Sequence, residues 1–465
     1  MLLLSAAGLW NLLDLGLHQT FSNAYTRHFQ SGNFEKFTRQ MAIGLALMGV
    51  VIAVGVAGLV IWVTADWWRL SILTRAIPGA DAAAILLMLG LSVLVQTAAG
   101  VVSPIYRAQD KFSRGLLLEL LSSGLRLTAL AATAVAGASP VTVSAVYFFS
   151  TVVGYSYMLR DQFKNLNGIT LRPQLPRAEE LMDTARPATW FYVQHAANVL
   201  LIGAPLLVLG HLDGPMGGIA AFGLLRTLTN FIRQVGQILA NSPAIELSRL
   251  WFQLRDVELI QDRIRRGCRF IAVVVGVLAG GLMLLLGAIF NVWSVGRIEP
   301  RVNVGLIFCF GVVLTAPSML IANFLNYINV ARIGAYSRVI SLVVATICAI
   351  VLARPYELAG VASALVVGET VGFWLVYLPS AARWTGMNQY ALAGSWLGYS
   401  ILGFSPMLIL AAAFFGIDGW LRVPVWGAPV LAVIGVITIL IFGVSPLDRK
   451  KLASGLLRRW CRTPS

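Results

Sequence analysis

The sequence predicts an all-α, polytopic integral membrane protein. Three observations lead to this class: thirteen long apolar runs, a composition that is 58% hydrophobic and 12% charged, and basic residues concentrated in every second gap between the runs. Most runs contain about 20 residues or more, the length that crosses the hydrocarbon core of a bilayer as a helix. Because lipid offers the backbone no hydrogen-bond partner, segments of this length must be helical.

The apolar runs follow one another across short polar gaps. They occupy residues 2–25, 40–62, 82–106, 115–137, 140–159, 187–210, 215–240, 270–293, 303–325, 333–353, 357–379, 390–416 and 424–443. The first run differs from a signal peptide because it lacks a charged start and an obvious cleavage site. The external gaps are too short for a catalytic loop, and no Gly-rich phosphate loop is present. We therefore expect no enzyme activity, no catalytic residue, no cofactor and no direct drive by ATP.

The distribution of basic residues predicts the orientation of the chain. One alternate set of gaps, together with the C-terminal tail, contains 26 of the 35 Lys and Arg residues. Loops rich in Lys and Arg stay in the cytoplasm, so the C-terminus is expected inside the cell. Thirteen crossings then place Met1 outside, where no basic flank would hold it. The topology predicts that a first helix precedes the present start.

The net charge of +15 has a membrane explanation. The basic residues lie in short loops beside apolar spans, where they contact anionic lipid headgroups, so nucleic acid is not an expected partner. The four cysteines form no CxxC pair and have no His at metal-binding spacing, so we expect unpaired thiols and no metal. They are Cys268, Cys309, Cys348 and Cys461.

Two long hydrophilic stretches divide the chain. We expect an N-terminal lobe of five spans at 1–160, a cytoplasmic linker at 161–186, a C-terminal lobe of six spans at 187–380, and two added spans with a basic tail at 381–465. The other hydrophilic stretch, 244–269, is predicted to be an amphipathic helix on the inner membrane surface, with a solvated charged loop as the alternative.

A weak internal repeat indicates two pseudo-symmetric bundles. Tyr106 and Tyr327 each end an apolar run and are followed five residues later by a basic residue, Lys111 or Arg332. Counting the missing first helix, the two lobes would contain six helices each. Parallel repeats of this kind occur in transporters that bind substrate between the repeats.

The opening segment resembles a known family. Its residues 8–17 read GLWNLLDLGL and are followed by Asn23 and Arg27, which resembles the second helix of bacterial oligosaccharide flippases. Residues 106–112, YRAQDKF, are similar to the turn after the fourth helix of that family. These flippases form the polysaccharide-transport branch of the multidrug/oligosaccharidyl-lipid/polysaccharide exporter superfamily. Members have twelve or fourteen helices with both termini cytoplasmic, and the first of these helices is missing here.

The resemblance implies a function and a location. It implies a flippase that moves an undecaprenyl-pyrophosphate-linked oligosaccharide across the bacterial inner membrane, by alternating access, for O-antigen or exopolysaccharide synthesis. The expected partners are this lipid-linked substrate and the bilayer, with a polysaccharide polymerase and other assembly proteins as further candidates. The alternative is a lipid II flippase or a cation-coupled multidrug exporter of the same superfamily, although cation exporters favour acidic cavities.

The seventh run contains the strongest candidate site. Four polar residues recur at steps of four, three and four, which places them on one stripe of a helix. They are Arg226, Asn230, Arg233 and Gln237. A charged side chain inside a membrane is costly and normally faces a bundle interior or water, and Arg binds phosphate through a two-pronged contact. The stripe predicts a cationic cavity lining; the alternative is that Arg233 reaches the interface and Arg226 forms a structural pair.

Further polar residues inside the spans complete the candidate set. Glu119 and Arg126 are seven residues apart on one face of the fourth run, and Arg126 is expected to line the same cavity from the other lobe. Glu119 is open to three interpretations: an ion pair with Arg126, an interfacial position, or a proton-coupling carboxylate.

Four more positions are candidates because of their depth in the spans. Gln194 and Asn198, with His195 beside them, offer amides suited to sugar hydroxyls. Asp14 is a coupling candidate for which a role in the fold is the favoured interpretation. Glu369 is a coupling candidate that would either line the cavity or pair with an arginine.

Overall fold

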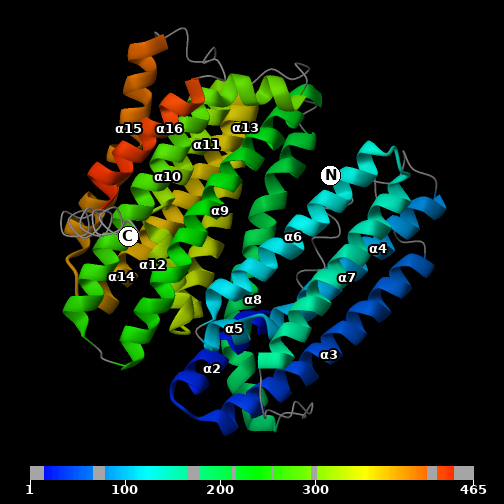
Figure 1. Ribbon diagram of the computed structural model, residues 1–465. Coiled ribbons are helices and arrows are strands. Elements are labelled where there is room, and N and C mark those ends of the chain that lie inside the picture. Colours follow the sequence, from blue (N-terminus) through cyan, green and yellow to red (C-terminus); the bar gives the residue numbers. More distant parts are fainter. Residues whose placement is uncertain are drawn as a thin grey trace, which may run out of the picture. The chain divides into compact units, whose positions relative to one another are not determined.

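The computed structural model is helical throughout the residues that it describes, which are 15–65, 79–109, 111–165, 177–211, 216–253, 256–294, 301–415 and 427–444 (Figure 1). The chain divides into two compact units, Met1–Ala196 and Ala197–Ser465. These units are called unit 1 and unit 2. The expected all-α membrane fold is confirmed.

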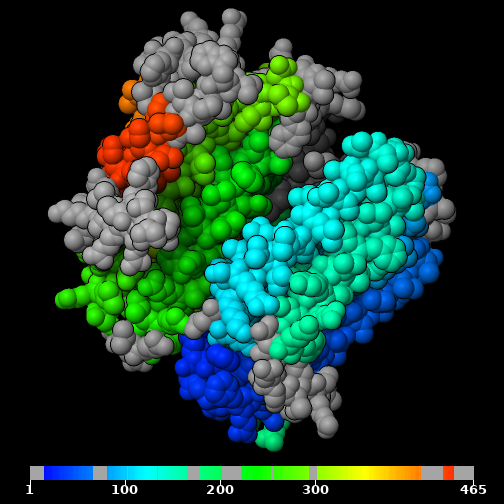
Figure 2. All heavy atoms as spheres, viewed as in Figure 1, coloured from blue at the N-terminus to red at the C-terminus, as the bar shows by residue number. Residues whose placement is uncertain are grey.

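Unit 1 is a bundle of long apolar helices. Its helices are α2 (Leu17–Gln30), α3 (Phe34–Thr64), α4 (Gly79–Val102), α5 (Pro104–Ala108), α6 (Phe112–Val135), α7 (Pro140–Asn165) and the first half of α8 (Ala178–His211). Helix α7 packs against both α4 and α6, and α3 packs against α4, so these helices run side by side (Figure 1). Helix α6 exposes several leucines, including Leu117, Leu121 and Leu127, which suits contact with lipid. Its surface lies open on the side of unit 1 that Figure 2 shows.

Unit 2 is built around one central helix. Its helices are the second half of α8, α9 (Met216–Gln253), α10 (Val257–Ser294), α11 (Val302–Thr315), α12 (Ser318–Tyr327), α13 (Ala331–Gly372), the π-helix η4 (Phe373–Tyr377), α14 (Leu378–Thr385), α15 (Gln389–Phe415), α16 (Gly427–Thr438) and the π-helix η6 (Ile439–Gly443). Helix α10 packs against α9, α11, α15 and η6. Its buried residues Ile264, Ile271 and Val275 lie in the main apolar core of the unit.

Six of the described helical segments are long and apolar enough to cross a membrane. A seventh is formed if α11 and α12, which meet at an angle of 51°, count as one broken span. The segment Ala331–Thr385 covers two expected spans, the apolar runs 333–353 and 357–379. Glu357, where the second run begins, has a φ of 46° and marks a kink between them. Helices α8 and α9 occupy the sixth and seventh runs, and α9 carries the polar stripe.

The boundary between the units lies inside α8 rather than in a linker. Helix α7 extends to Asn165 and α8 begins at Ala178, so helices occupy both ends of the expected linker 161–186. The start of α8 is tied to unit 1 by an ion pair between Arg39 and Glu180. Glu180 also accepts a hydrogen bond of 2.9 Å from the backbone N–H of Arg177, which caps the helix.

The stretch 244–269 is not a separate surface helix, and that prediction was wrong. Helix α9 continues through Pro243 to Gln253, and α10 begins at Val257. Each half of the stretch carries buried residues, Leu247 on α9 and Ile264 on α10, that pack into the core of unit 2. The charged residues therefore belong to the ends of two long helices.

The first of the two added C-terminal spans is integral to unit 2. Trp396 and Phe404 of α15 lie in the main core. Helices α10 and α15 approach closely at glycines: a Cβ on Gly276 would lie 2.7 Å from the backbone of Gly403, and one on Gly403 would lie 2.8 Å from Val273. Small residues allow backbones in a membrane to pack at this distance.

Candidate functional site

The polar stripe of α9 lines a cavity in unit 2. Arg226, Asn230, Arg233 and Gln237 all contribute to its wall. The cavity has a volume of about 290 Å³, and α8 contributes Asn198. Arg338 from the first half of α13 and Glu369 from its second half complete the charged lining. With Phe308 and Val312 of α11, residues on four helices thus meet at one cavity.

Arg233 and Glu369 form a bidentate ion pair in this cavity. Arg233 Nη1 donates to Glu369 Oε1 at 2.6 Å, and Arg233 Nη2 donates to Oε2 of the same carboxylate. Arg338 Nη1 lies 4.0 Å from Glu369 Oε1, and its guanidinium carbon lies 4.9 Å from the centre of the Phe373 ring. Only 11% of the Glu369 side chain is exposed, so the carboxylate has little water to stabilise its charge.

The cavity carries more positive than negative charge. Arg226, Arg233 and Arg338 line it, whereas Glu369 is the one carboxylate among the described lining residues. Arg226 Nη2 lies 3.5 Å from the carbonyl oxygen of Leu201. The lining therefore keeps a cationic surplus, which favours an anionic ligand.

A network of amides adjoins the stripe. Asn323 Nδ2 donates to Gln237 Oε1 at 3.2 Å and to Asn241 Oδ1 at 2.8 Å. Tyr327 donates its hydroxyl to the same Asn241 oxygen at 3.2 Å. These groups link α9 to α12 and place several hydrogen-bonding side chains next to the charged cavity.

Unit 1 holds a different pocket, of about 240 Å³. Its titratable lining residues are His18 on α2, Glu119 on α6, Tyr155 on α7 and His195 on α8. Gln96 on α4 adds an amide. Among the described lining residues none is Lys or Arg, so this pocket lacks the fixed cations that line the unit 2 cavity.

The ion pair considered between Glu119 and Arg126 does not form. Residues seven apart on a helix are separated by about 10 Å along its axis, which is too far for contact. Arg126 instead donates to Ser123 Oγ at 2.8 Å and lies 5.7 Å from the centre of the Tyr155 ring. Glu119 lines the pocket with the two histidines, so the interpretation as an Arg126 partner was wrong.

Of the remaining candidate residues, one lines the unit 2 cavity and one lines neither pocket. Asn198 lines the unit 2 cavity, whereas Gln194, one turn earlier on α8, lines neither pocket. The Oε1 atom of Gln194 is buried without a hydrogen-bond partner among the described residues. Asp14 lies outside the described residues. Two residues later Gly16 has a φ of 73°, and a Cβ there would lie 2.3 Å from the carbonyl oxygen of Ala188.

Two site residues were missed by sequence reasoning. Arg338 is one of the 26 basic residues that the charge count assigns to the cytoplasmic gaps, although it lies five residues inside the apolar run 333–353. That depth was the available signal. His18 was not singled out, although it directly follows the DLGL segment.

Three of the four cysteines lie among the described residues. Cys268, Cys309 and Cys348 are unpaired, and Cys461 lies outside the described residues. Within the described ranges, no group of three His, Cys, Asp or Glu side chains could hold a metal ion.

Solved structures of similar architecture are MATE transporters. A crystal structure of a MATE point mutant superposes with a TM-score of 0.69 at 18% identity, covering 82% of this chain and 85% of that one. An outward-facing multidrug resistance MATE family transporter of the MOP superfamily superposes with a TM-score of 0.65 at 18% identity, covering 84% and 87%. The chain therefore has the MATE-type helical membrane transporter fold.

A third similar structure differs in the character of its site. It is a MOP superfamily transporter from Pyrococcus furiosus, described as having a binding pocket of reverse polarity that suggests a different function. It superposes with a TM-score of 0.65 at 19% identity, covering 84% of this chain and 87% of that one. No sequence family and no curated protein sequence matches this chain. The likeness covers the fold and does not single out the polysaccharide-transport branch expected from the sequence.

Proposed function

We propose that this chain is an alternating-access transporter that moves an undecaprenyl-pyrophosphate-linked oligosaccharide across the bacterial inner membrane for surface polysaccharide synthesis. The observation that carries the proposal is the cavity in which Arg226, Arg233 and Arg338 surround the single carboxylate of Glu369. A pyrophosphate matches this cationic surplus, because guanidinium groups bind phosphate oxygens through paired hydrogen bonds. The adjoining amides of Gln237, Asn241 and Asn323 would bind sugar hydroxyls.

The fold supports transport as the activity class. MATE transporters of this fold have been solved in outward-facing and inward-facing conformations, which are the two end states of alternating access. Since those relatives are transporters, we propose transport and no enzymatic reaction for this chain. The titratable pocket of unit 1, with Glu119, His18 and His195, is the proposed site of coupling to a cation.

A vesicle assay tests the proposed substrate. The purified chain is reconstituted into lipid vesicles. The rate at which an undecaprenyl-pyrophosphate oligosaccharide moves from the outer to the inner leaflet is measured. We expect Arg226→Gln to lower the rate at least tenfold while insertion stays normal, and Arg226→Lys to restore it in part, because an ammonium keeps the charge but not the forked geometry. Arg332→Gln on the exposed start of α13 is the matched control and should transport normally. Equal rates for Arg226→Gln and the parent protein would contradict the proposal.

The second candidate function is cation-coupled multidrug export. The outward-facing relative named above is a multidrug resistance transporter, which favours this alternative. The sign of the cavity charge opposes it, because a cationic drug would be repelled by the three arginines. Efflux of a cationic dye from the same vesicles, increased by Arg226→Gln, would favour the drug exporter over the flippase.

We also propose that the basic ends of the helices face the cytoplasm. This orientation follows from the distribution of Lys and Arg over alternate gaps. Ser31 precedes α3 and Ala136 follows α6, and both are exposed. An impermeant thiol reagent applied to intact cells should label Ala136→Cys and spare Ser31→Cys. The reverse pattern would invert the proposed topology.

A further inference from the structure

Unit 2 contains a second cavity that the proposed transport mechanism does not use. It has a volume of about 550 Å³ and is bounded by α9, the start of α10, α15 and the end of η6. Ligand pockets of small molecules have volumes of roughly 300–1,000 Å³. No described residue lines both this cavity and the cavity formed by the polar stripe of α9. The two cavities are therefore distinct sites.

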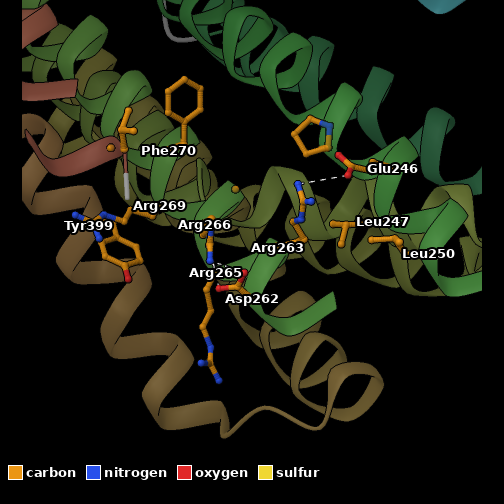
Figure 3. Close-up of a pocket in the computed structure, with 14 residues that line it drawn as sticks. Glu246, Leu247, Leu250, Asp262, Arg263, Arg265, Arg266, Arg269, Phe270 and Tyr399 are labelled. Atoms are coloured by element: carbon orange, nitrogen blue, oxygen red, sulfur yellow. Dashed lines mark hydrogen bonds and ion pairs between the residues drawn. The ribbon is translucent and has the colours of Figure 1, made fainter. Parts of the chain in front are cut away.

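Four arginines of α10 line this second cavity. They are Arg263, Arg265, Arg266 and Arg269. The carboxylates among the described lining residues are those of Glu246 and Asp262. Arg263 Nη1 lies 3.4 Å from Glu246 Oε1, and Arg266 Nη2 lies 2.9 Å from Asp262 Oδ2 (Figure 3). Two of the four positive charges thus face a carboxylate.

The other two arginines have no carboxylate partner in the described part of the chain. Arg269 donates from Nε to the carbonyl oxygen of Phe442 in η6, and its guanidinium lies 5.6 Å from the centre of the Tyr399 ring. Arg265 is exposed and extends past the pairs formed by its neighbours (Figure 3). A ligand that adds negative charge would therefore be stabilised here without displacing an existing ion pair.

The wall of the cavity is apolar as well as basic. Leu247 and Leu250 from α9 and Phe270 from α10 line it beside the arginines. The cavity also lies where α10 changes character, because charged residues occupy 262–269 and the apolar run 270–293 begins directly after them. Arginine-rich ends of membrane helices lie at the headgroup level, where Tyr side chains are also enriched. A ligand that fits must be anionic at one end and apolar at the other.

We propose that this cavity binds the phosphodiester headgroup of an anionic glycerophospholipid. The phosphate oxygens would accept hydrogen bonds from Arg265 and Arg269, and the glycerol and upper acyl chains would lie on Leu247, Leu250 and Phe270. Because the site touches α9, α10, α15 and η6, a bound lipid joins the main bundle to η6, the last helix among the described residues. The lipid thereby stabilises unit 2 independently of the transported substrate.

Lipid titration of the purified full-length chain tests this site. The thermal midpoint is measured in a neutral detergent while phosphatidylglycerol, phosphatidylcholine or inorganic phosphate is added, and retained lipid is counted by native mass spectrometry. We expect phosphatidylglycerol to raise the midpoint and to be retained. Arg265→Gln should need about tenfold more phosphatidylglycerol for half of the rise, the effect of losing one charged hydrogen-bond pair. Arg265→Lys should lie between the two.

The control variant is Arg383→Gln. Arg383 is exposed on α14 and does not line the cavity, so the variant removes the same charge elsewhere in unit 2. It should titrate like the parent protein. An identical response of Arg265→Gln and the parent would overturn the proposal. So would an Arg265-dependent rise with inorganic phosphate, which would indicate a site for a soluble anion, or equal stabilisation and retention with phosphatidylcholine.

Discussion

The two units hold polar pockets with different charged groups. In unit 2, Arg226, Arg233 and Arg338 surround Glu369, and the arginines keep their charge at any physiological pH. In unit 1 the described lining contains Glu119, two histidines and a tyrosine, and no Lys or Arg. Imidazole and carboxylate groups change charge with their surroundings. This difference is the basis of the proposal that unit 2 binds the anionic substrate and unit 1 provides the coupling site.

The largest effect is expected when the ion pair between Arg233 and Glu369 in the unit 2 cavity is broken. Arg233→Ala removes the forked partner of Glu369 and leaves a buried carboxylate with Arg338 at 4.0 Å as its nearest cation. We expect a loss of about 3–5 kcal/mol of unfolding free energy, the typical cost of breaking a buried pair. Thermal unfolding in detergent micelles measures it.

A double-mutant cycle gives this prediction a sharper form. The Arg233→Ala, Glu369→Ala double variant should be less destabilised than the sum of the two single variants, because neither charge is left alone. Additive losses would mean that the pair does not hold unit 2 together, and the contrast with unit 1 would weaken.

Unit 1 should respond most strongly to a change in backbone packing. Gly16 has a left-handed φ of 73° and lies against the carbonyl oxygen of Ala188, whereas Gly32 has a φ of 71° and no atom within 4 Å of the position that a Cβ would take. Gly16→Ala should cost roughly 2–4 kcal/mol, since strain and overlap add, and Gly32→Ala roughly 1 kcal/mol from strain alone. Equal losses, measured by thermal unfolding, would show that the contact between α2 and α8 is not tight.

A more modest effect is expected at the pocket of unit 1. Glu119 is exposed, so Glu119→Gln should leave stability within about 0.5 kcal/mol of the parent protein. Transport driven by an imposed pH gradient should fall about tenfold, whereas exchange without a gradient should continue. Both rates are measured in the same vesicles. A parent-like response to the gradient would remove Glu119 from the coupling site.

The smallest effect concerns the start of α8. The hydrogen bonds that Glu180 accepts, first from Arg39 and then from the Arg177 backbone, lower the pKa of Glu180 to about 2. Its contribution to stability is complete above the ordinary carboxyl pKa of about 4.5 and is lost as the pH falls toward 2. As the pH falls through this window, the unfolding free energy of Glu180→Gln should decrease less than that of the parent protein. The difference between the two decreases should be less than about 1 kcal/mol. Thermal midpoints of both proteins from pH 6 to pH 3 provide the measurement.

The sequence by itself determined the fold class and one half of the unit 2 cavity. Run lengths near 20 residues leave the backbone in lipid no alternative to helix. The steps of four, three and four bring Arg226, Asn230, Arg233 and Gln237 to one side of α9, because helical periodicity is a local property. Neither result depends on which helices are neighbours.

Tertiary structure alone decided what faces the stripe. Glu369 is 136 residues from Arg233, and no periodicity along one helix relates positions on two. The same limit explains one error. A pair between Glu119 and Arg126 was one of three interpretations of Glu119, but two helical turns separate the residues, and packing instead places Glu119 in one pocket with His18 and His195. Local spacing fixes which side of a helix a residue occupies, and only the packing of helices decides what lies opposite.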